Sequence, residues 1–168
     1  MKKPILITSI LAFSLMLAGC NSIQEHKAES IIKNYYQAII DEDYEEAFEQ
    51  LYLYDYDSEN EYSKLSEGTT LSDKDAKDFY LKKTEVLNKQ KYKIKNFEFV
   101  EVEYEDGHSF WHHIKLEVEK NGKKYEWNEV AHLYDGKLLI GEKNDPYVNY
   151  RDGKMNFDIE KEAEKDGI

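Results

Sequence analysis

Apolar residues recur at helical spacing in three stretches of the first half of the chain. Between about Glu25 and Ile40 they form one stripe, which predicts an amphipathic helix. Asp41-Glu42-Asp43 ends this pattern, and Asp43 can cap a second helix, with Glu46 as the reciprocal partner in a capping box. A third helix is predicted from the N-cap Ser72 to about Asn88. The positions expected to be buried are Ala28, Ile31, Ile32, Tyr35, Ala38, Ile39, Tyr44, Ala47, Phe48, Leu51, Ala76, Phe79, Tyr80, Val86 and Leu87.

After Lys89 the period of the pattern changes to two, which is typical of strands. The parity of apolar positions slips between Ile94 and Phe97 and predicts a bulge near Asn96. The predicted strands are Tyr92–Tyr104, Phe110–Val118, Tyr125–Tyr134 and Lys137–Glu142, joined by the turn dipeptides Asp106-Gly107, Asn121-Gly122 and Asp135-Gly136.

Two segments lack this regularity. Tyr54 to Thr70 is polar and irregular and is predicted to be a loop. Residues 151–168 are predicted to be a polar tail or a short helix, which would cover Asp158–Lys165. The chain therefore holds a single α+β domain over residues 28–150, with N-terminal helices packed on a curved antiparallel sheet.

The order of these elements resembles a known family. Tyr35-Tyr36-Gln37-Ala38-Ile39, followed by Asp43-Tyr44-Glu45-Glu46-Ala47-Phe48, is similar to the opening of nuclear-transport-factor-like domains, also grouped as cystatin-like. The resemblance implies a cone, in which the sheet curls around the helices and leaves a pocket at its open end. Relatives use that pocket for isomerase or dehydratase chemistry, for ligand binding, or only for protein contact, so the fold alone decides no function.

The first 20 residues have the pattern of an export signal. Lys2 and Lys3 precede an apolar run from Ile5 to Ala18, which is too short to cross a bilayer. The run ends in Leu17-Ala18-Gly19-Cys20, which resembles the lipobox of bacterial lipoproteins. The resemblance implies cleavage between Gly19 and Cys20 and a diacylglyceryl group on Cys20, the single cysteine of the chain. Residues 1–19 are then the signal peptide, and residues 20–27 are a tether to the extracytoplasmic face of the cell membrane.

Composition restricts the partners. The net charge is −12, and removal of the signal takes away two lysines and no acid, which gives −14. Such a surface repels nucleic acid and anionic headgroups, so the acyl chains carry the membrane attachment. We expect a protein partner at the cell envelope and no nucleic-acid partner.

His112 is the candidate for chemistry, because its parity places it on the apolar side of its strand. It could be a general base, or a core histidine bonded to a tyrosine. Glu129 and Glu101 are further acids on the predicted strands. We expect no metal, because His112 and His113 point to opposite faces of one strand and cannot join His108 and His132 around zinc. The alternating acids Asp55, Asp57, Glu59 and Glu61 lack the glycine and the final glutamate of a calcium loop.

Tyr52, Tyr54 and Tyr56 lie beside an acidic stretch and form the candidate interaction surface, since tyrosine is enriched at protein interfaces. Their alternative role is packing on the domain's own helices. The sequence contains no nucleophile triad, phosphate loop or cofactor motif. The favoured function is a non-catalytic, membrane-tethered binding or protein-interaction module. The alternatives are a cone-fold small-molecule enzyme or ligand-binding protein, and an accessory subunit of an envelope secretion or conjugation apparatus.

Overall fold

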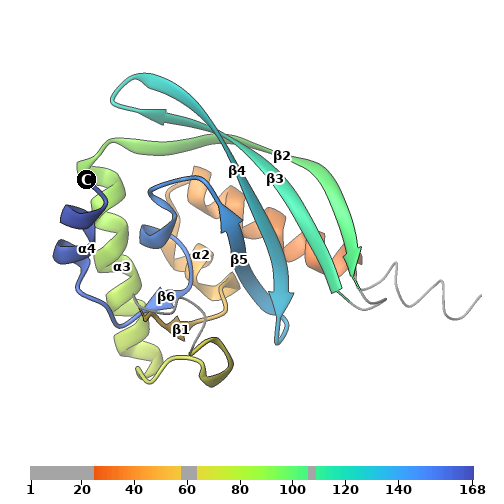
Figure 1. The fold of residues 1–168 in the computed structure, drawn as a ribbon, viewed down its shortest axis with the longest axis horizontal. Coiled ribbons are helices and arrows are strands. Elements are labelled where there is room, and N and C mark those ends of the chain that lie inside the picture. The colour runs from red at the N-terminus through yellow and green to blue at the C-terminus, as the bar shows by residue number, and fades with distance from the viewer. Residues whose placement is uncertain (1–24, 58–63, 106–108) are drawn as a thin grey trace, which may run out of the picture.

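The computed structural model describes residues 25–57, 64–105 and 109–168. A helix over residues 25–40 is followed by α2 (Tyr44–Gln50) and α3 (Asp73–Lys89), and α4 (Ile159–Lys165) lies near the end of the chain. Four antiparallel strands form one sheet in the order β2 (Tyr92–Glu105), β3 (Ser109–Lys120), β4 (Lys123–Tyr134) and β5 (Lys137–Lys143). The sheet arches over the helix of residues 25–40, drawn in orange in Figure 1. The predicted α+β class is confirmed.

The helices begin where their capping residues predict. The side chain of Asp43 accepts a hydrogen bond from the backbone N–H of Glu46 at the start of α2. Ser72 accepts one from the backbone N–H of Asp75 at the start of α3, and Asp158 caps α4 in the same way. Each cap satisfies an amide that the first turn of a helix leaves unpaired.

Two of the predicted hairpin turns lie within the described residues. Asn121 and Gly122 have φ of 49° and 77°, and Asp135 and Gly136 have 49° and 76°. A two-residue turn of type I′ needs positive φ at both positions, which Asn-Gly and Asp-Gly tolerate. The third dipeptide, Asp106-Gly107, lies outside the described residues.

The long strand β2 is bent by irregular pairing with β3. Its register shifts between Ile94 and Asn96, which confirms the predicted bulge, and again between Phe99 and Glu101, which was not predicted. The pairing of β4 with β5 shifts between Glu129 and Ala131. The shifts at Phe99/Glu101 and at Glu129/Ala131 lie on either side of His113 in β3. Because bulges increase the local twist, the sheet is expected to bend most strongly there.

The core lies between the helices and the sheet. Tyr36 of the first helix stacks on Phe97 of β2, with ring centroids 5.2 Å apart. Phe48 of α2 packs against Tyr80 of α3 at 5.5 Å. Ile114 and Leu116 of β3 lie on the same buried face of the sheet. The first helix therefore covers the sheet, as the sequence predicts.

The segment predicted to be a loop contains paired structure. Strand β1 (Tyr54–Asp55) pairs in parallel with β6 (Lys154–Met155), about a hundred residues away, and a 3-10 helix covers Leu65–Glu67. The expectation of a loop over the whole of Tyr54–Thr70 is wrong for these residues. Because each strand is only two residues long, neither shows a periodic pattern.

The C-terminal segment contains the predicted short helix, α4, but the residues before it are not a tail. After a 3-10 helix (Val148–Tyr150), residues 151–155 are all buried. Arg151, Asp152 and Lys154 are among them, and Lys154 belongs to β6, which pairs with β1. The domain therefore continues beyond residue 150, and its centre includes charged side chains.

Truncation of Phe48 tests the packing of the helices. Phe48 is 8% exposed in α2, and Phe48→Ala should cost about 3–5 kcal/mol of unfolding free energy, because it removes a buried aromatic ring. Urea denaturation of the two proteins measures the difference. Glu49→Ala, on the exposed side of the same helix, should change the unfolding free energy by no more than about 0.5 kcal/mol. Equal midpoints for Phe48→Ala and the wild type would contradict the packing.

Candidate functional site

The single arginine of the chain lies at the centre of the fold. Arg151 follows the 3-10 helix Val148–Tyr150 and is 0% exposed. Its Nη1 donates to Oε2 of Glu129 at 3.1 Å, and its Nη2 bonds to the other oxygen of that carboxylate. Nη2 also donates to Oδ2 of Asp145 at 2.7 Å. One planar guanidinium thus joins β4 to the segment after β5, which is the geometry that favours arginine over lysine.

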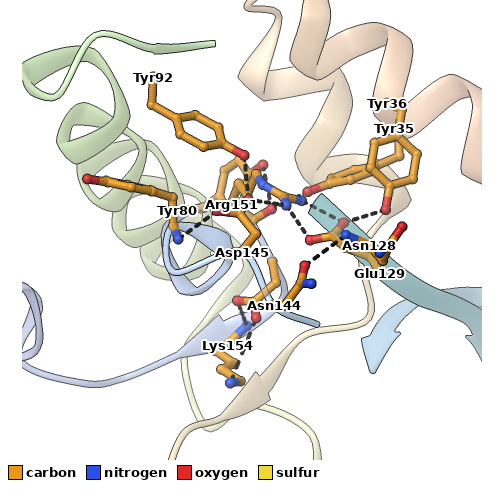
Figure 2. Close-up of polar contacts among 12 residues, drawn as sticks. Tyr35, Tyr36, Tyr80, Tyr92, Asn128, Glu129, Asn144, Asp145, Arg151 and Lys154 are labelled. Atoms are coloured by element: carbon orange, nitrogen blue, oxygen red, sulfur yellow. Dashed lines mark hydrogen bonds and ion pairs between the residues drawn. The ribbon is translucent and has the colours of Figure 1, made fainter. Parts of the chain in front are cut away.

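Four tyrosines surround this arginine (Figure 2). The Tyr36 hydroxyl donates to Oε2 of Glu129 at 2.6 Å, and the Tyr92 hydroxyl donates to Oδ2 of Asp145. Tyr35 and Tyr80 donate to the backbone carbonyl of Arg151, at 2.6 Å and 3.2 Å. Tyr35 and Tyr36 come from the first helix, Tyr80 from α3 and Tyr92 from β2, so the cluster ties three elements to the C-terminal segment. We call Arg151, Glu129, Asp145 and these tyrosines the Arg151 cluster.

Burial sets the charges of the cluster. It disfavours a charged guanidinium, but Glu129, Tyr92 and Asp145 outweigh this effect and raise the pKa of Arg151 above its usual value. Burial, together with the negative charge of Glu129, raises the pKa of Tyr36. Burial also raises the pKa of Tyr92. The arginine therefore stays charged and the tyrosines stay protonated donors.

A second buried cation lies next to the cluster. Lys83 of α3 is 0% exposed, and its ammonium group donates to the carbonyl oxygens of Asp152 and Lys154, the latter at 2.8 Å. It also lies 3.2 Å from Oδ1 of Asp152. The three donors of a lysine ammonium are suited to such a set of oxygens. Lys83 therefore fastens the C-terminal segment to α3.

The buried carboxylates of the Arg151 cluster are engaged by its donors. Glu129, one of the two further acids considered on the strands, is 1% exposed and accepts from Arg151 and Tyr36. Glu101, the other acid considered, is exposed on the opposite face of the sheet. Removing one member of such a network leaves an unpaired buried charge, whereas the complete network is compatible with a folded core. The geometry is that of a structural ion network.

His112 lies where its parity predicts, on the inner face of β3 and fully buried. Its ring packs edge-on against Phe99, with centroids 5.6 Å apart. Within the described residues, neither ring nitrogen has a hydrogen-bond partner, so the tyrosine partner considered from the sequence is not found there. Burial lowers the pKa of His112, and Glu29 and Glu25 of the first helix act in the opposite direction. His112 is separate from the Arg151 cluster's hydrogen bonds.

The other histidines of the described residues lie apart from His112. His132 lies over Trp111, with centroids 3.8 Å apart, and burial lowers its pKa to about 4. His113 points to the opposite face from His112 and lies 3.4 Å from Glu103. His108 is outside the described residues. Among the residues described, no three histidine, cysteine or acidic side chains cluster as metal ligands.

The buried His112 and the half-buried His132 should make the protein acid-sensitive. Because the folded pKa values lie below the ordinary value of about 6.5, the unfolded state binds protons first as the pH falls. Stability should be fully present above pH 6.5 and should decrease as the pH falls towards about 4. Urea midpoints measured across this range should fall less steeply for His112→Gln and His132→Gln, and least for the double variant. A double variant with the wild-type slope would contradict this assignment.

The predicted tyrosine surface is largely internal. Tyr54 is 1% exposed, so its assignment to an interaction surface is wrong. The Tyr52 hydroxyl donates to the carbonyl of Leu65, and its ring packs on Tyr134. Tyr56 is half-buried and bonds through its hydroxyl to Glu162 of α4. These rings pack on the domain itself, which was the alternative left open.

Asp55, the first acid of the supposed calcium loop, is buried and has its own donors. It accepts from the hydroxyls of Thr69 and Thr70, at 2.8 Å and 2.7 Å, and from Asn156 at 3.4 Å. Burial alone would raise its pKa, but these hydrogen bonds outweigh burial and lower it. Asp55 therefore connects β1 to the following loop. Glu59 and Glu61 lie outside the described residues.

The export signal, including Gly19 and Cys20, also lies outside the described residues. Across the part of the chain that is described, the helices are all too short or too polar to span a bilayer.

Comparison with known proteins returned no relative. No family model matches the chain, and no curated protein and no solved structure is similar to it.

Proposed function

We propose that the protein is a lipoprotein, anchored through Cys20 to the extracytoplasmic face of the cell membrane, whose folded domain is a non-catalytic binding module for another protein. We further propose that the domain is a cone of the nuclear-transport-factor-like kind. The order of helices and strands and the arching of the sheet over the first helix support this fold.

The observation that carries the proposal is the occupied interior. In a cone, a substrate would enter between the helices and the concave face of the sheet. Here that space holds the Arg151 cluster, with Arg151 and Tyr36 each 0% exposed. Within the cluster, the Arg151 Nη atoms and the Tyr36 hydroxyl bond to the carboxylates of Glu129 and Asp145. A domain whose interior is closed in this way offers its surface for recognition.

Substitution of the lipobox cysteine tests the anchor. Cys20→Ser should abolish incorporation of a labelled fatty acid and move the protein from the membrane fraction to the soluble fraction, because a diacylated cysteine supplies both chains that stable anchoring needs. Labelling followed by fractionation of cells measures both effects. A wild-type protein that carries no label would refute the anchor, and so would a labelled Cys20→Ser variant.

A screen of small metabolites by thermal shift tests the closed interior. A ligand that binds only the folded state raises the melting temperature. We expect no metabolite to stabilise the protein through the interior. The proposal fails if a compound raises the melting temperature of the wild type and its effect is lost in Tyr36→Phe.

A further inference from the structure

A depression of about 490 Å³ opens on the sheet. Glu101 of β2, His113 of β3 and Val130 of β4 form one row of paired positions across it. In the neighbouring row of paired positions, His112 and Ala131 are fully buried and Val102 is half-buried, so Glu101 and His113 belong to the opposite face of the sheet. Val100, Asn128 and Asn144 also line it, together with the buried residues Ile114 and Glu129. The depression therefore borders the Arg151 cluster at Glu129, while Glu101 of its lining is exposed.

The depression lies in an acidic part of the surface. Glu98, Glu101 and Glu103 are all exposed on β2. Lys115, on the neighbouring strand, is already paired with Glu126 at 2.8 Å. Within the described residues, neither Glu98 nor Glu101 has an ion-pair partner. Glu98 lies opposite Lys115 and Glu103 lies 3.4 Å from His113, so Glu101 is the carboxylate of this group to which a positively charged partner has the freest approach.

The strand that carries these acids is an edge of the sheet. In the described part of the chain, β2 pairs with β3 and with no other strand (Figure 1). Its outer side therefore presents backbone N–H and C=O groups to which a further strand can pair. Val100, at the second register shift, is 62% exposed, and Tyr104 near the end of the strand is 47% exposed. These side chains give an added strand apolar contacts.

The rim also supplies neutral hydrogen-bonding groups. The Asn144 side-chain oxygen accepts from the backbone N–H of Asn128 at 2.8 Å, which leaves the amino group of Asn144 available. In the described residues, the carboxamide of Asn128 makes no hydrogen bond. The depression thus combines a carboxylate, two amide groups and an apolar wall, a set suited to an aliphatic side chain that ends in a cation.

We infer that β2 receives an extended, basic segment of a partner protein, which pairs with the strand edge, places a lysine or arginine side chain beside Glu101 and packs an apolar residue on Val100. This inference rests on the proposed protein-binding function and names the chemistry of the partner. A second copy of this chain is disfavoured by the net charge of −12, and Lys93 of the same strand is already paired with Glu42. A small free cation would make no use of Val100 or of the strand edge.

The experiment uses the full-length lipoprotein in a non-ionic detergent and a fluorescent eight-residue peptide that alternates lysine with valine. Anisotropy should show saturable binding that weakens as salt is raised, because exposed charges are screened. Glu101→Lys should weaken binding by about tenfold, and Val100→Asp should also weaken it. Glu160→Lys, the same charge change on the exposed side of α4, should alter it less than twofold.

Hydrogen exchange of the complex supplies the second measurement, since an added strand should slow exchange of β2 amides. Four results would overturn the inference: no binding of the lysine peptide, equal binding of a glutamate–valine peptide, equal effects of Glu101→Lys and Glu160→Lys, or unchanged exchange in β2. Full competition by spermine would also overturn it, in favour of a small-cation site. Concentration-dependent dimers lost in Glu101→Lys would do so in favour of self-association. None of these results bears on the lipid anchor or on the closed interior, which fatty-acid labelling and the thermal-shift screen test separately. Failure of this inference is therefore distinguishable from failure of the proposed function.

Discussion

Replacement of Arg151 by methionine should destabilise the protein by about 3–5 kcal/mol, because the carboxylates of Glu129 and Asp145 would stay buried without their cation. Methionine keeps much of the side chain's length and apolar packing, so the loss reports mainly on the charge and its hydrogen bonds. Urea denaturation at neutral pH measures the effect.

Two matched variants separate charge from packing. Arg151→Lys keeps a cation but cannot bond both oxygens of Glu129, and it should lose less than Arg151→Met does. The triple variant Arg151→Met, Glu129→Leu, Asp145→Leu removes every charge of the network and should recover much of the stability, as apolar replacements of buried ion networks do. An Arg151→Met protein as stable as the wild type would mean that the side chain is solvated.

Replacement of Gly153 by alanine should lower the unfolding free energy by about 3 kcal/mol or more, because the atoms nearest to the added methyl group belong to the backbone and cannot move aside easily. A Cβ atom there would lie 1.8 Å from the carbonyl oxygen of Tyr52 and 2.9 Å from its carbon. Both are backbone atoms beside the paired strands β1 and β6, where the amide of Tyr54 bonds to the carbonyl of Gly153 at 3.0 Å. The substitution should therefore separate the C-terminal segment from the rest of the domain.

Gly141 provides the control for this substitution. A Cβ atom there would lie 3.6 Å from Trp111 and from the carbonyl of Val130, at ordinary contact distance. Gly141→Ala in β5 should leave the unfolding free energy unchanged or raise it by up to about 1 kcal/mol. Equal stabilities of Gly153→Ala and Gly141→Ala would contradict the close approach of residues 52 and 153.

The features predicted from the sequence are those that local chemistry determines. The stripe of residues 25–40, the caps Asp43 and Ser72 and the turns Asn121-Gly122 and Asp135-Gly136 each depend on neighbours within a few positions. The inward direction of His112 followed from simple alternation along β3.

The centre of the fold was missed because it depends on residues far apart in the sequence. Segment 151–155 is rich in charge, and no periodic pattern shows that its charges have buried partners. One indication was present. Glu129 was one of two acids considered on the predicted strands, and an acid that is buried requires a cation. Arg151 is the single arginine among many lysines, and arginine is the residue preferred for a buried two-oxygen pair.

The tyrosines were harder to assign because a tyrosine serves equally well in a core and at an interface. Helical spacing predicted burial of Tyr35 and Tyr80 but not of Tyr36, and the hydroxyl partners of all three depend on where Arg151 and Glu129 lie. Tyr52, Tyr54 and Tyr56 belong to the segment whose pairing with β6 was not foreseen, and burial of Tyr54 follows from that pairing.

The most direct test of the account is the exchange rate of the Arg151 Nε–H proton with water, measured by NMR at neutral pH. The side chain is the only arginine, so its signal needs no assignment among others. A closed interior predicts that this proton exchanges as slowly as the amides of the core, because exchange then requires opening of the structure. Exchange as fast as in a free arginine would show that solvent reaches the centre of the domain, and would contradict a module that recognises its partner only through its surface.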